Sequence, residues 1–194
     1  MHDIPFKPFH FMRHGQTDWN VRKLCMGSTD IPLNENGRAQ AQGAAKYLAN
    51  EKIELIVSSP QLRALETAQI VSAIIQKPVS IIHNLRECCW GDREGQPIDH
   101  HAEAQWRAGH LDNGSEALEH FDMRIKNTLI QVLSLSANVL MVSHSGVYRA
   151  IQRTLCVVMA NVHNCAVLHH KPEMINAKMT WVAENLIKEE LLKI

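Results

Sequence analysis

Residues 9–15 read FHFMRHG, a short and largely apolar run that ends in an arginine, a histidine and a glycine. The bulky side chains of residues 9–12 predict a short buried strand. Arg13 and His14 follow at its carboxyl end, where Gly15 lets the backbone turn sharply beside the histidine ring. If other strands of the chain end in the same way, their polar residues will meet these two.

The rest of the chain alternates strand-like and helix-like patterns. Apolar runs predict further strands over residues 53–57, 79–82, 139–142, 166–169 and 179–183. Helical spacing predicts helices over residues 36–50, 60–75, 115–135 and 147–158, with Ser59 as the N-cap of the second and Pro60 in its first turn. This alternation predicts an α/β fold, a three-layer α/β/α sandwich with a mainly parallel central sheet.

Polar residues follow four of the predicted strands. Arg13 and His14 follow the first, and Arg63 lies one turn into the helix after the second. Glu87 comes soon after the third strand and His144 directly after the fourth. Because parallel strands direct their carboxyl ends to one edge of the sheet, we expect these five side chains to converge there.

Two arginines and two histidines in one pocket form a dense set of cationic hydrogen-bond donors. Guanidinium groups bind phosphate oxygens bidentately, and such a cradle stabilises a phosphoryl group in transfer. His14 qualifies as the nucleophile because the arginine charges disfavour its protonation, and a backbone carbonyl near Gly15 is expected to fix its tautomer. Glu87 is the natural general acid, which protonates the leaving alcohol and later activates water.

Composition narrows the class of protein. The 194 residues are enough for one compact domain, and we assign all of residues 1–194 to it. Lys and Arg number 20, as do Asp and Glu, so there is no basic excess that would indicate a nucleic-acid partner. No apolar run is long enough for a signal peptide or a membrane span, which favours the cytoplasm. The odd cysteine count favours reduced thiols, at Cys25, Cys88, Cys89, Cys156 and Cys165.

Several stretches in order resemble one family. The run FMRHGQTDWN is similar to the signature of the histidine phosphatase superfamily, in its phosphoglycerate mutase-like branch 1. The similarity continues through MGSTDIPLNENGRAQA, SSPQLRALETAQ, LRE, NGSEALEHFDMRI and VLMVSHSGVYRAI, so it covers nearly the whole chain. The chain most resembles the small broad-specificity phosphatases of that branch.

The resemblance implies a fold, an activity and residue roles. It implies a phosphoglycerate mutase-like fold and a phosphomonoesterase that needs no cofactor and hydrolyses a small phosphorylated metabolite. His14 would be the phosphorylated nucleophile and Glu87 the proton donor. Arg13, Arg63 and His144 would hold the phosphoryl group, with Asn20 reaching it from the first loop.

Four positions depart from the family pattern. Met26 stands where many relatives have a polar residue, so one phosphate contact is expected to be missing. Ser145 replaces the usual glycine after the closing histidine, which is expected to shift an oxyanion contact. Arg93 replaces a frequent tryptophan and alters the acid loop, whereas Gln16 replaces a frequent glutamate with little expected consequence.

The main alternative is a mutase of the same superfamily. Mutases carry a longer insertion after the acid, with an adjacent arginine pair. Residues 88–112 are polar and aperiodic, and predict a shorter, lid-like insertion. Within residues 88–115 only Arg93 and Arg107 are arginines, and they are not adjacent, which favours a phosphatase. The oligomeric state stays open between a monomer and a homodimer.

Other classes fit the sequence less well. A non-enzymatic binder would have lost the nucleophile or a phosphate-binding arginine, and none is lost. A cysteine phosphatase, a serine hydrolase and a P-loop protein each need a motif that the chain lacks. A zinc site is the remaining idea, but its candidate ligands match no familiar spacing: His83, Cys88, Cys89, His100 and His101.

Overall fold

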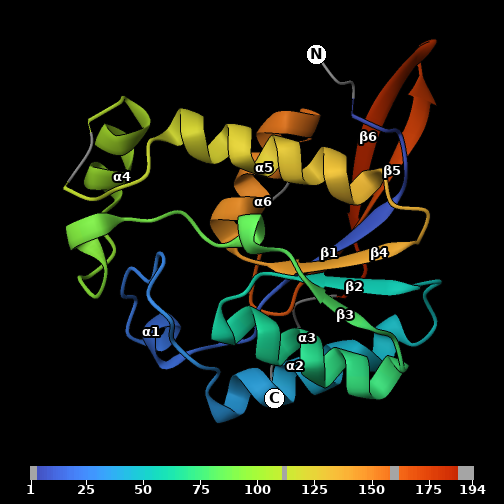
Figure 1. Ribbon diagram of the computed structural model, residues 1–194, viewed down its shortest axis with the longest axis horizontal. Coiled ribbons are helices and arrows are strands. Elements are labelled where there is room, and N and C mark those ends of the chain that lie inside the picture. The colour runs from blue at the N-terminus through green and yellow to red at the C-terminus, as the bar shows by residue number, and fades with distance from the viewer. Residues whose placement is uncertain (1–3, 111–112, 158–161, 188–194) are drawn as a thin grey trace.

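A six-stranded sheet lies between two helical layers in the computed structural model, which describes residues 4–110, 113–157 and 162–187 (Figure 1). The strand order is β3-β2-β4-β1-β5-β6. The pairings β3-β2, β2-β4 and β4-β1 are parallel, whereas β5 is antiparallel to both of its neighbours and alone runs in reverse. The predicted sandwich with a mainly parallel sheet is confirmed. The strands are β1 (Phe9–Arg13), β2 (Leu55–Ser58), β3 (Val79–Ile81), β4 (Val139–Ser143), β5 (Val167–Ile175) and β6 (Lys178–Asn185).

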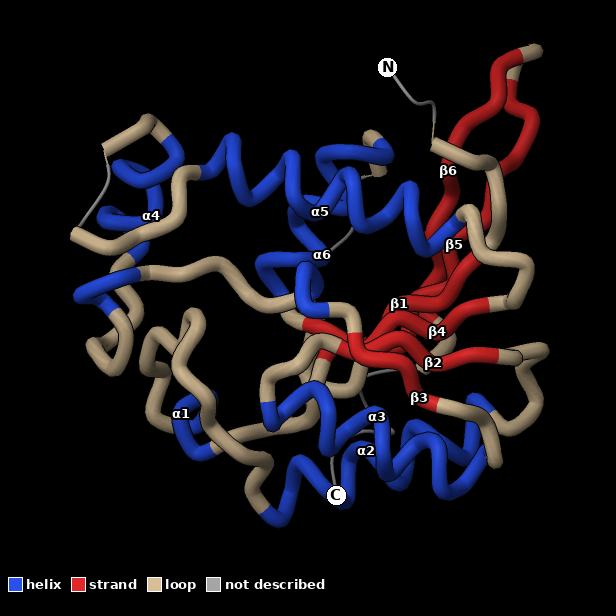
Figure 2. Tube along the Cα trace, in the orientation of Figure 1, coloured by secondary structure: helices blue, strands red, loops and turns tan. Residues whose placement is uncertain are grey.

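Helices cover both faces of the sheet (Figure 2). Helices α2 (Glu35–Leu48) and α3 (Leu62–Ile75) share a buried apolar cluster with Met12 of β1, and α5 (Leu118–Leu133) and α6 (Ser145–Leu155) share the other with Phe11. Neighbouring residues of a strand point to opposite faces, so a strand covered on both sides is largely apolar. Within the described residues, no helix is long and apolar enough to span a membrane.

The stretch predicted to be aperiodic contains a helix. Residues 88–110 include a short 3-10 turn, Gly91–Arg93, and α4 (His100–Arg107), which begins after the N-cap Asp99. Ala102 and Trp106 are the only buried residues of α4, too few to give a helical period, and Trp106 packs on Trp90 with ring centroids 4.7 Å apart. The end of the predicted insertion, residues 111–112, lies outside the described residues.

Several predicted boundaries shift. The helix predicted over residues 60–75 begins at Leu62 with Gln61 as its N-cap, so the prediction of Ser59 as the cap was wrong. The helix predicted from residue 147 begins at Ser145, and residue 158 lies outside the described part. Besides the elements within residues 88–110, two short elements were not predicted: α1 (Asp18–Val21) and the 3-10 turn His83–Leu85.

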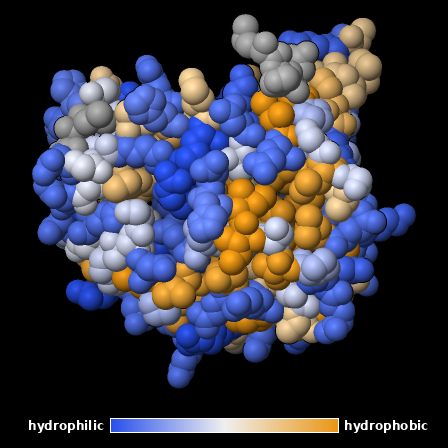
Figure 3. Space-filling view, viewed as in Figure 1, coloured by the Kyte–Doolittle hydropathy of each residue, from blue (hydrophilic) through white to orange (hydrophobic). Residues whose placement is uncertain are grey.

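Strand β3 forms an open edge of the sheet. Ile81 on this strand is 47% exposed. On the face of the molecule that Figure 3 shows, which is the face seen in Figure 1, apolar residues gather in one area with hydrophilic surface around them. The opposite edge is β6, whose hairpin with β5 extends beyond the helical layers (Figure 1).

Candidate active site

A cavity of about 580 Å³ lies at the carboxyl ends of the parallel strands. Five of the six predicted site residues line it: Arg13, His14, Asn20, Arg63 and Glu87. The sixth, His144, lies directly behind, with its ring centroid 5.2 Å from that of His14. The structure therefore brings together the residues that the sequence placed at four strand ends.

His14 is buried, and its ring orientation is fixed by its neighbour. Its Nδ1 lies 2.7 Å from the carbonyl oxygen of Gly15, which accepts a hydrogen bond from the N–H at that position, so the Nε2 lone pair stays available. Burial lowers the pKa of His14 well below its ordinary value, and the charges of Arg63 and Arg13 lower it further. The ring is therefore neutral at pH 7, as a nitrogen nucleophile must be.

Gly15 is held on two sides. Its backbone N–H donates to Oγ1 of Thr67 on α3 at 3.0 Å. A Cβ atom at Gly15 would lie 2.4 Å from the carbonyl oxygen of Gly37 on α2, so only glycine permits this approach of two backbones. Helices α2 and α3 thus fix the carbonyl that orients His14.

His144 is fully buried and is oriented by Ser59. Its Nε2 lies 2.8 Å from Oγ of Ser59, and this oxygen accepts the backbone N–H of Gln61 at 3.3 Å. The serine hydroxyl pairs with Nε2 in either tautomer of the ring, and Nδ1 of His144 is buried with no partner among the described residues. Burial, followed by the charge of Arg63, lowers the pKa of His144 well below its ordinary value. Ser59 therefore orients a histidine and does not cap a helix.

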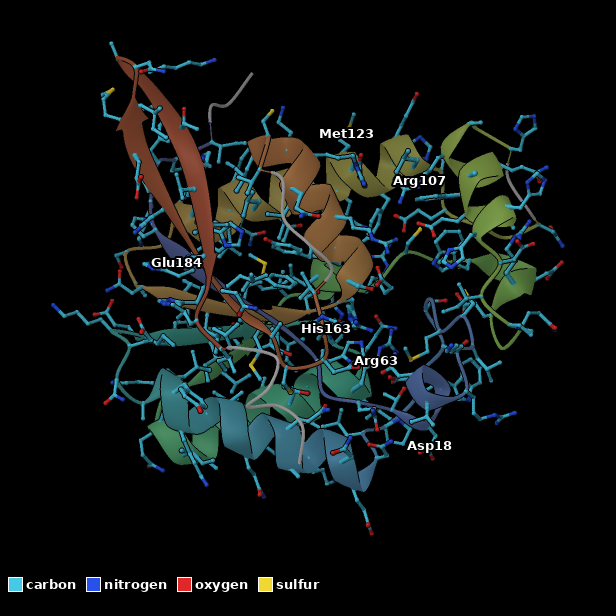
Figure 4. All side chains as sticks on the ribbon, turned by 180° about the vertical axis from the view of Figure 1, so that it is seen from behind. Asp18, Arg63, Arg107, Met123, His163 and Glu184 are labelled. Atoms are coloured by element: carbon cyan, nitrogen blue, oxygen red, sulfur yellow. The ribbon has the colours of Figure 1, made fainter. Side chains whose placement is uncertain are left out.

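The two arginines are held by backbone carbonyls. Arg63 is almost fully buried, and its terminal nitrogens donate to Thr29 O at 2.8 Å and to Gly27 O at 2.9 Å. Figure 4 places Arg63 at the end of α3 nearest α1. Arg13 donates to Val162 O at 2.8 Å, and Nε of each arginine is buried with no partner in the part of the chain that the structure describes. Burial lowers the pKa of Arg13 and of Arg63 to about 10, so both stay cationic at pH 7.

The side-chain oxygen of Asn20 is engaged in hydrogen bonds within the protein. Its Oδ1 accepts from the backbone N–H of Thr17 at 3.1 Å and from Nδ2 of Asn164 at 3.2 Å. Asn164 also donates to the backbone oxygen of His14 at 3.0 Å. Because the oxygen of Asn20 is engaged, its amide nitrogen is the group offered to the cavity.

The Glu87 carboxyl group is nearly buried and is held by backbone donors. Oε1 accepts the N–H of Cys88 at 2.9 Å, and Oε2 accepts the N–H of Gly146 at 2.9 Å. A Cβ atom at Gly146 would lie 2.2 Å from Oε1, so this glycine makes room for the carboxylate. The backbone N–H of Glu87 donates to Oε1 of Gln61 at 2.7 Å, a partner that the sequence did not reveal.

Three of the four departures from the family pattern line the cavity, at Met26, Arg93 and Ser145. The sulfur of Met26 lies 3.3 Å from Oγ1 of Thr17. The fourth, Gln16, accepts from the side-chain amides of Asn34 and Asn36 near the start of α2, each at 3.1 Å. Gln16 therefore contacts the start of α2, whereas Met26, Arg93 and Ser145 form part of the cavity wall.

The residues considered as zinc ligands do not form a cluster. Among residues 4–110, 113–157 and 162–187, no group of three or more His, Cys, Asp and Glu side chains is placed to hold a metal ion.

A model of the histidine phosphatase superfamily, branch 1, matches residues 9–176. The chain belongs to this superfamily. Among similar proteins, this histidine phosphatase is 33% identical to the uncharacterized phosphatase PhoE of Bacillus subtilis (strain 168) over 142 residues, which cover 72% of each chain. It is 32% identical to phosphoglycerate mutase-like protein 4 of Arabidopsis thaliana over 163 residues, 77% of this chain and 71% of that protein.

A solved structure shares both the fold and the phosphatase name. A mycobacterial glucosyl-3-phosphoglycerate phosphatase in complex with VO3 superposes with a TM-score of 0.80 at 26% identity, over 92% of this chain and 97% of that one. The family match and the phosphatase-named relatives support a phosphoric monoester hydrolase, as the sequence predicted.

Proposed function

We propose that this histidine phosphatase hydrolyses a small phosphomonoester through a phosphohistidine on His14, with Glu87 as the general acid and base. One observation carries the proposal. Beside the neutral ring of His14, three nitrogen atoms are buried with no hydrogen-bond partner among the described residues: Nε of Arg13, Nε of Arg63 and Nδ1 of His144. An unsatisfied buried donor is costly, and the oxygens of a bound phosphoryl group supply the missing acceptors.

The reaction then has two steps. Nε2 of His14 attacks the phosphorus while the bond to the leaving oxygen breaks, and Glu87 gives its proton to that oxygen. Glu87 next takes a proton from water, whose oxygen attacks the phosphorus and breaks the P–N bond. Inorganic phosphate leaves and His14 is neutral again. Asn20 would join Arg13 in holding the equatorial oxygens.

Inhibition by vanadate tests the site. Vanadate adopts the trigonal-bipyramidal shape of the transferring group, to which the cradle should be complementary. We expect competitive inhibition of p-nitrophenyl phosphate hydrolysis, and a crystal soak should place vanadium between His14, His144, Arg13 and Arg63. Vanadium bound elsewhere, with no inhibition in solution, would contradict the proposal.

We also propose that the activity needs no metal ion or other cofactor. Arg13 and Arg63 already supply the positive charge that Mg²⁺ supplies in other phosphoryl-transfer enzymes. Turnover of p-nitrophenyl phosphate should therefore be unchanged in excess EDTA. Complete loss that a divalent ion restores would refute metal independence.

Hydrolysis is favoured over mutase-type transfer. Arg93 and Arg107 both line the cavity but come from separate elements, the 3-10 turn and α4, so they do not form an adjacent pair. A coupled mutase assay run beside a phosphate-release assay separates the two activities. We expect release of inorganic phosphate without exchange of a phosphoryl group between substrate positions.

We assign residues 1–194 to a single domain in which residues 88–112 cover the cavity, a role supported by Trp90 and Trp106 in its lining. The even charge balance argues against a nucleic-acid partner, and the five unpaired cysteines are consistent with the cytoplasm. Light scattering in solution distinguishes a monomer from a homodimer.

A further inference from the structure

The Glu94 side chain accepts hydrogen bonds from Ser28 and Thr29, which lie in a different loop of the chain. Its Oε1 accepts the N–H of Ser28 at 2.7 Å, the hydroxyl of Ser28 at 2.8 Å and the N–H of Trp90 at 3.0 Å. Its Oε2 accepts the N–H of Thr29 at 2.8 Å and the hydroxyl of Thr29 at 2.5 Å. Five donors thus converge on one carboxylate, and Gly27 leaves the space for it, since a Cβ there would lie 2.1 Å from Oε1.

These hydrogen bonds favour the charged form of Glu94. Burial alone would raise its pKa, but the donors from Thr29, Ser28 and Trp90 outweigh burial and hold the pKa below its ordinary value. Glu94 is therefore a carboxylate at neutral pH, with acceptor capacity only. Every one of its partners is a donor, so the arrangement is internally consistent.

The loop fixed by Glu94 also holds Arg63. The carbonyl oxygens of Gly27 and Thr29 accept hydrogen bonds from the two terminal nitrogens of the Arg63 guanidinium. Gly27 O accepts in addition from Nε2 of Gln61 at 3.0 Å. Because Glu94 binds the backbone N–H groups of Ser28 and Thr29, it sets the position of the two carbonyls that orient the guanidinium.

We propose that Glu94 is a positioning residue for the phosphoryl cradle, which acts by fixing the Gly27–Thr29 loop and, through it, the orientation of Arg63. This inference rests on the proposed function, in which Arg63 binds the phosphoryl group. A shift of about 1 Å in such a group costs on the order of a hundredfold in rate. Glu94 itself contacts no reacting atom.

The substitution Glu94→Gln tests the proposal with little change of shape. In either orientation of the new amide, its NH₂ group faces a backbone N–H, of Ser28 or of Thr29, and at least one hydrogen bond is lost. We expect kcat/KM to fall roughly tenfold to a hundredfold. The loss should be similar for p-nitrophenyl and alkyl phosphates, since the general acid stays in place. The control Glu119→Gln changes an exposed glutamate on α5 and should leave kcat/KM unchanged.

A double-mutant cycle separates this role from a general structural one. The dissociation constant of vanadate is measured by calorimetry for the wild type, Glu94→Gln, Arg63→Ala and the double variant. We expect Glu94→Gln to weaken vanadate binding about tenfold or more in the wild type, and less than about twofold when Arg63 is absent. Equal weakening in both backgrounds would overturn the inference.

Two further outcomes keep the test decisive. If Glu94→Gln does not fold, Thr29→Val removes one hydroxyl bond to Glu94 and should show a smaller loss with the same dependence on Arg63. Additive losses for Thr29→Val would also overturn the inference. If wild-type protein does not bind vanadate, the proposed function fails. Glu94 is then no positioning residue for a phosphoryl site.

Discussion

The Nδ1 atom of His14 lies 2.7 Å from the carbonyl oxygen of Gly15, the next residue in the chain. This contact decides which nitrogen of the ring is available for attack. Because the carbonyl oxygen can only accept, Nδ1 carries the proton and the lone pair stays on Nε2. The sequence predicted that a carbonyl near Gly15 would fix the tautomer, and the structure assigns that role to Gly15 itself.

Gly15→Ala should damage both stability and activity. The new Cβ would meet the carbonyl oxygen of Gly37 at 2.4 Å, and two backbones cannot separate as easily as a side chain turns aside. We expect a loss of about 1–3 kcal/mol in the free energy of unfolding, the range for overpacking. The carbonyl that orients His14 should shift as well, so kcat should fall. Urea denaturation and steady-state kinetics measure the two effects. Unchanged stability would show that α2 yields easily at this point.

Glu87→Gln should affect substrates according to their leaving groups. The amide keeps the size of the side chain but cannot give up a proton, so poor leaving groups suffer most. We expect a small loss of kcat with p-nitrophenyl phosphate and a loss of about 10²–10⁴-fold with an alkyl phosphate. Equal losses with both substrates would point to misfolding or to another acid.

The stability of the protein should fall as the pH drops below about 6.5. Burial, with lesser contributions from His169 and His10, lowers the pKa of His170 from 6.5 to about 3. Between these values the unfolded chain binds a proton that the folded state does not, so stability is full above pH 6.5 and is lost as the pH falls. Each such histidine contributes a slope of about 1.4 kcal/mol per pH unit, and His14 and His144 act in the same direction.

His170→Phe isolates one of these contributions. The new ring would take the place of the imidazole, which stacks on Phe9 with centroids 4.5 Å apart. We expect the slope of unfolding free energy against pH to decrease by about 1.4 kcal/mol per unit between about pH 6 and 4. Tyr148→Phe is the matched control, because it removes the same 3.2 Å contact to His170 Nε2 and keeps the histidine. An unchanged slope in His170→Phe would show that this histidine is charged when folded.

The strand ends were predictable because their signals are local. Arg13 ends β1, His14 and His144 directly follow β1 and β4, and the parallel pairing of these two strands is enough to bring them together. The position of Arg63 was predictable because it lies in the first turn of the helix that comes after the second strand. The prediction that these side chains converge depended on the pattern of strands and not on any single residue.

The contacts that orient these residues were not predictable, because they join distant parts of the chain. Glu94 binds Ser28 and Thr29, which are 66 and 65 positions away, and nothing in the spacing of loop residues indicates such a pairing. Ser59 follows β2 at the position of a helix cap, so its contact with His144, 85 positions away, was missed. Helix α4 was missed because its buried face consists of two residues.

Trapping of the covalent intermediate tests the central claim most directly. Substrate with a radioactive phosphoryl group is mixed with the enzyme and quenched within the first turnover, and the labelled peptide is identified. We predict a label on His14 that is lost in acid and stable in base, as expected of a phosphorus–nitrogen bond. The control His14→Ala should carry no label and should lose about 10³-fold or more in kcat. A label that survives acid, or a wild-type rate in His14→Ala, would contradict the histidine mechanism.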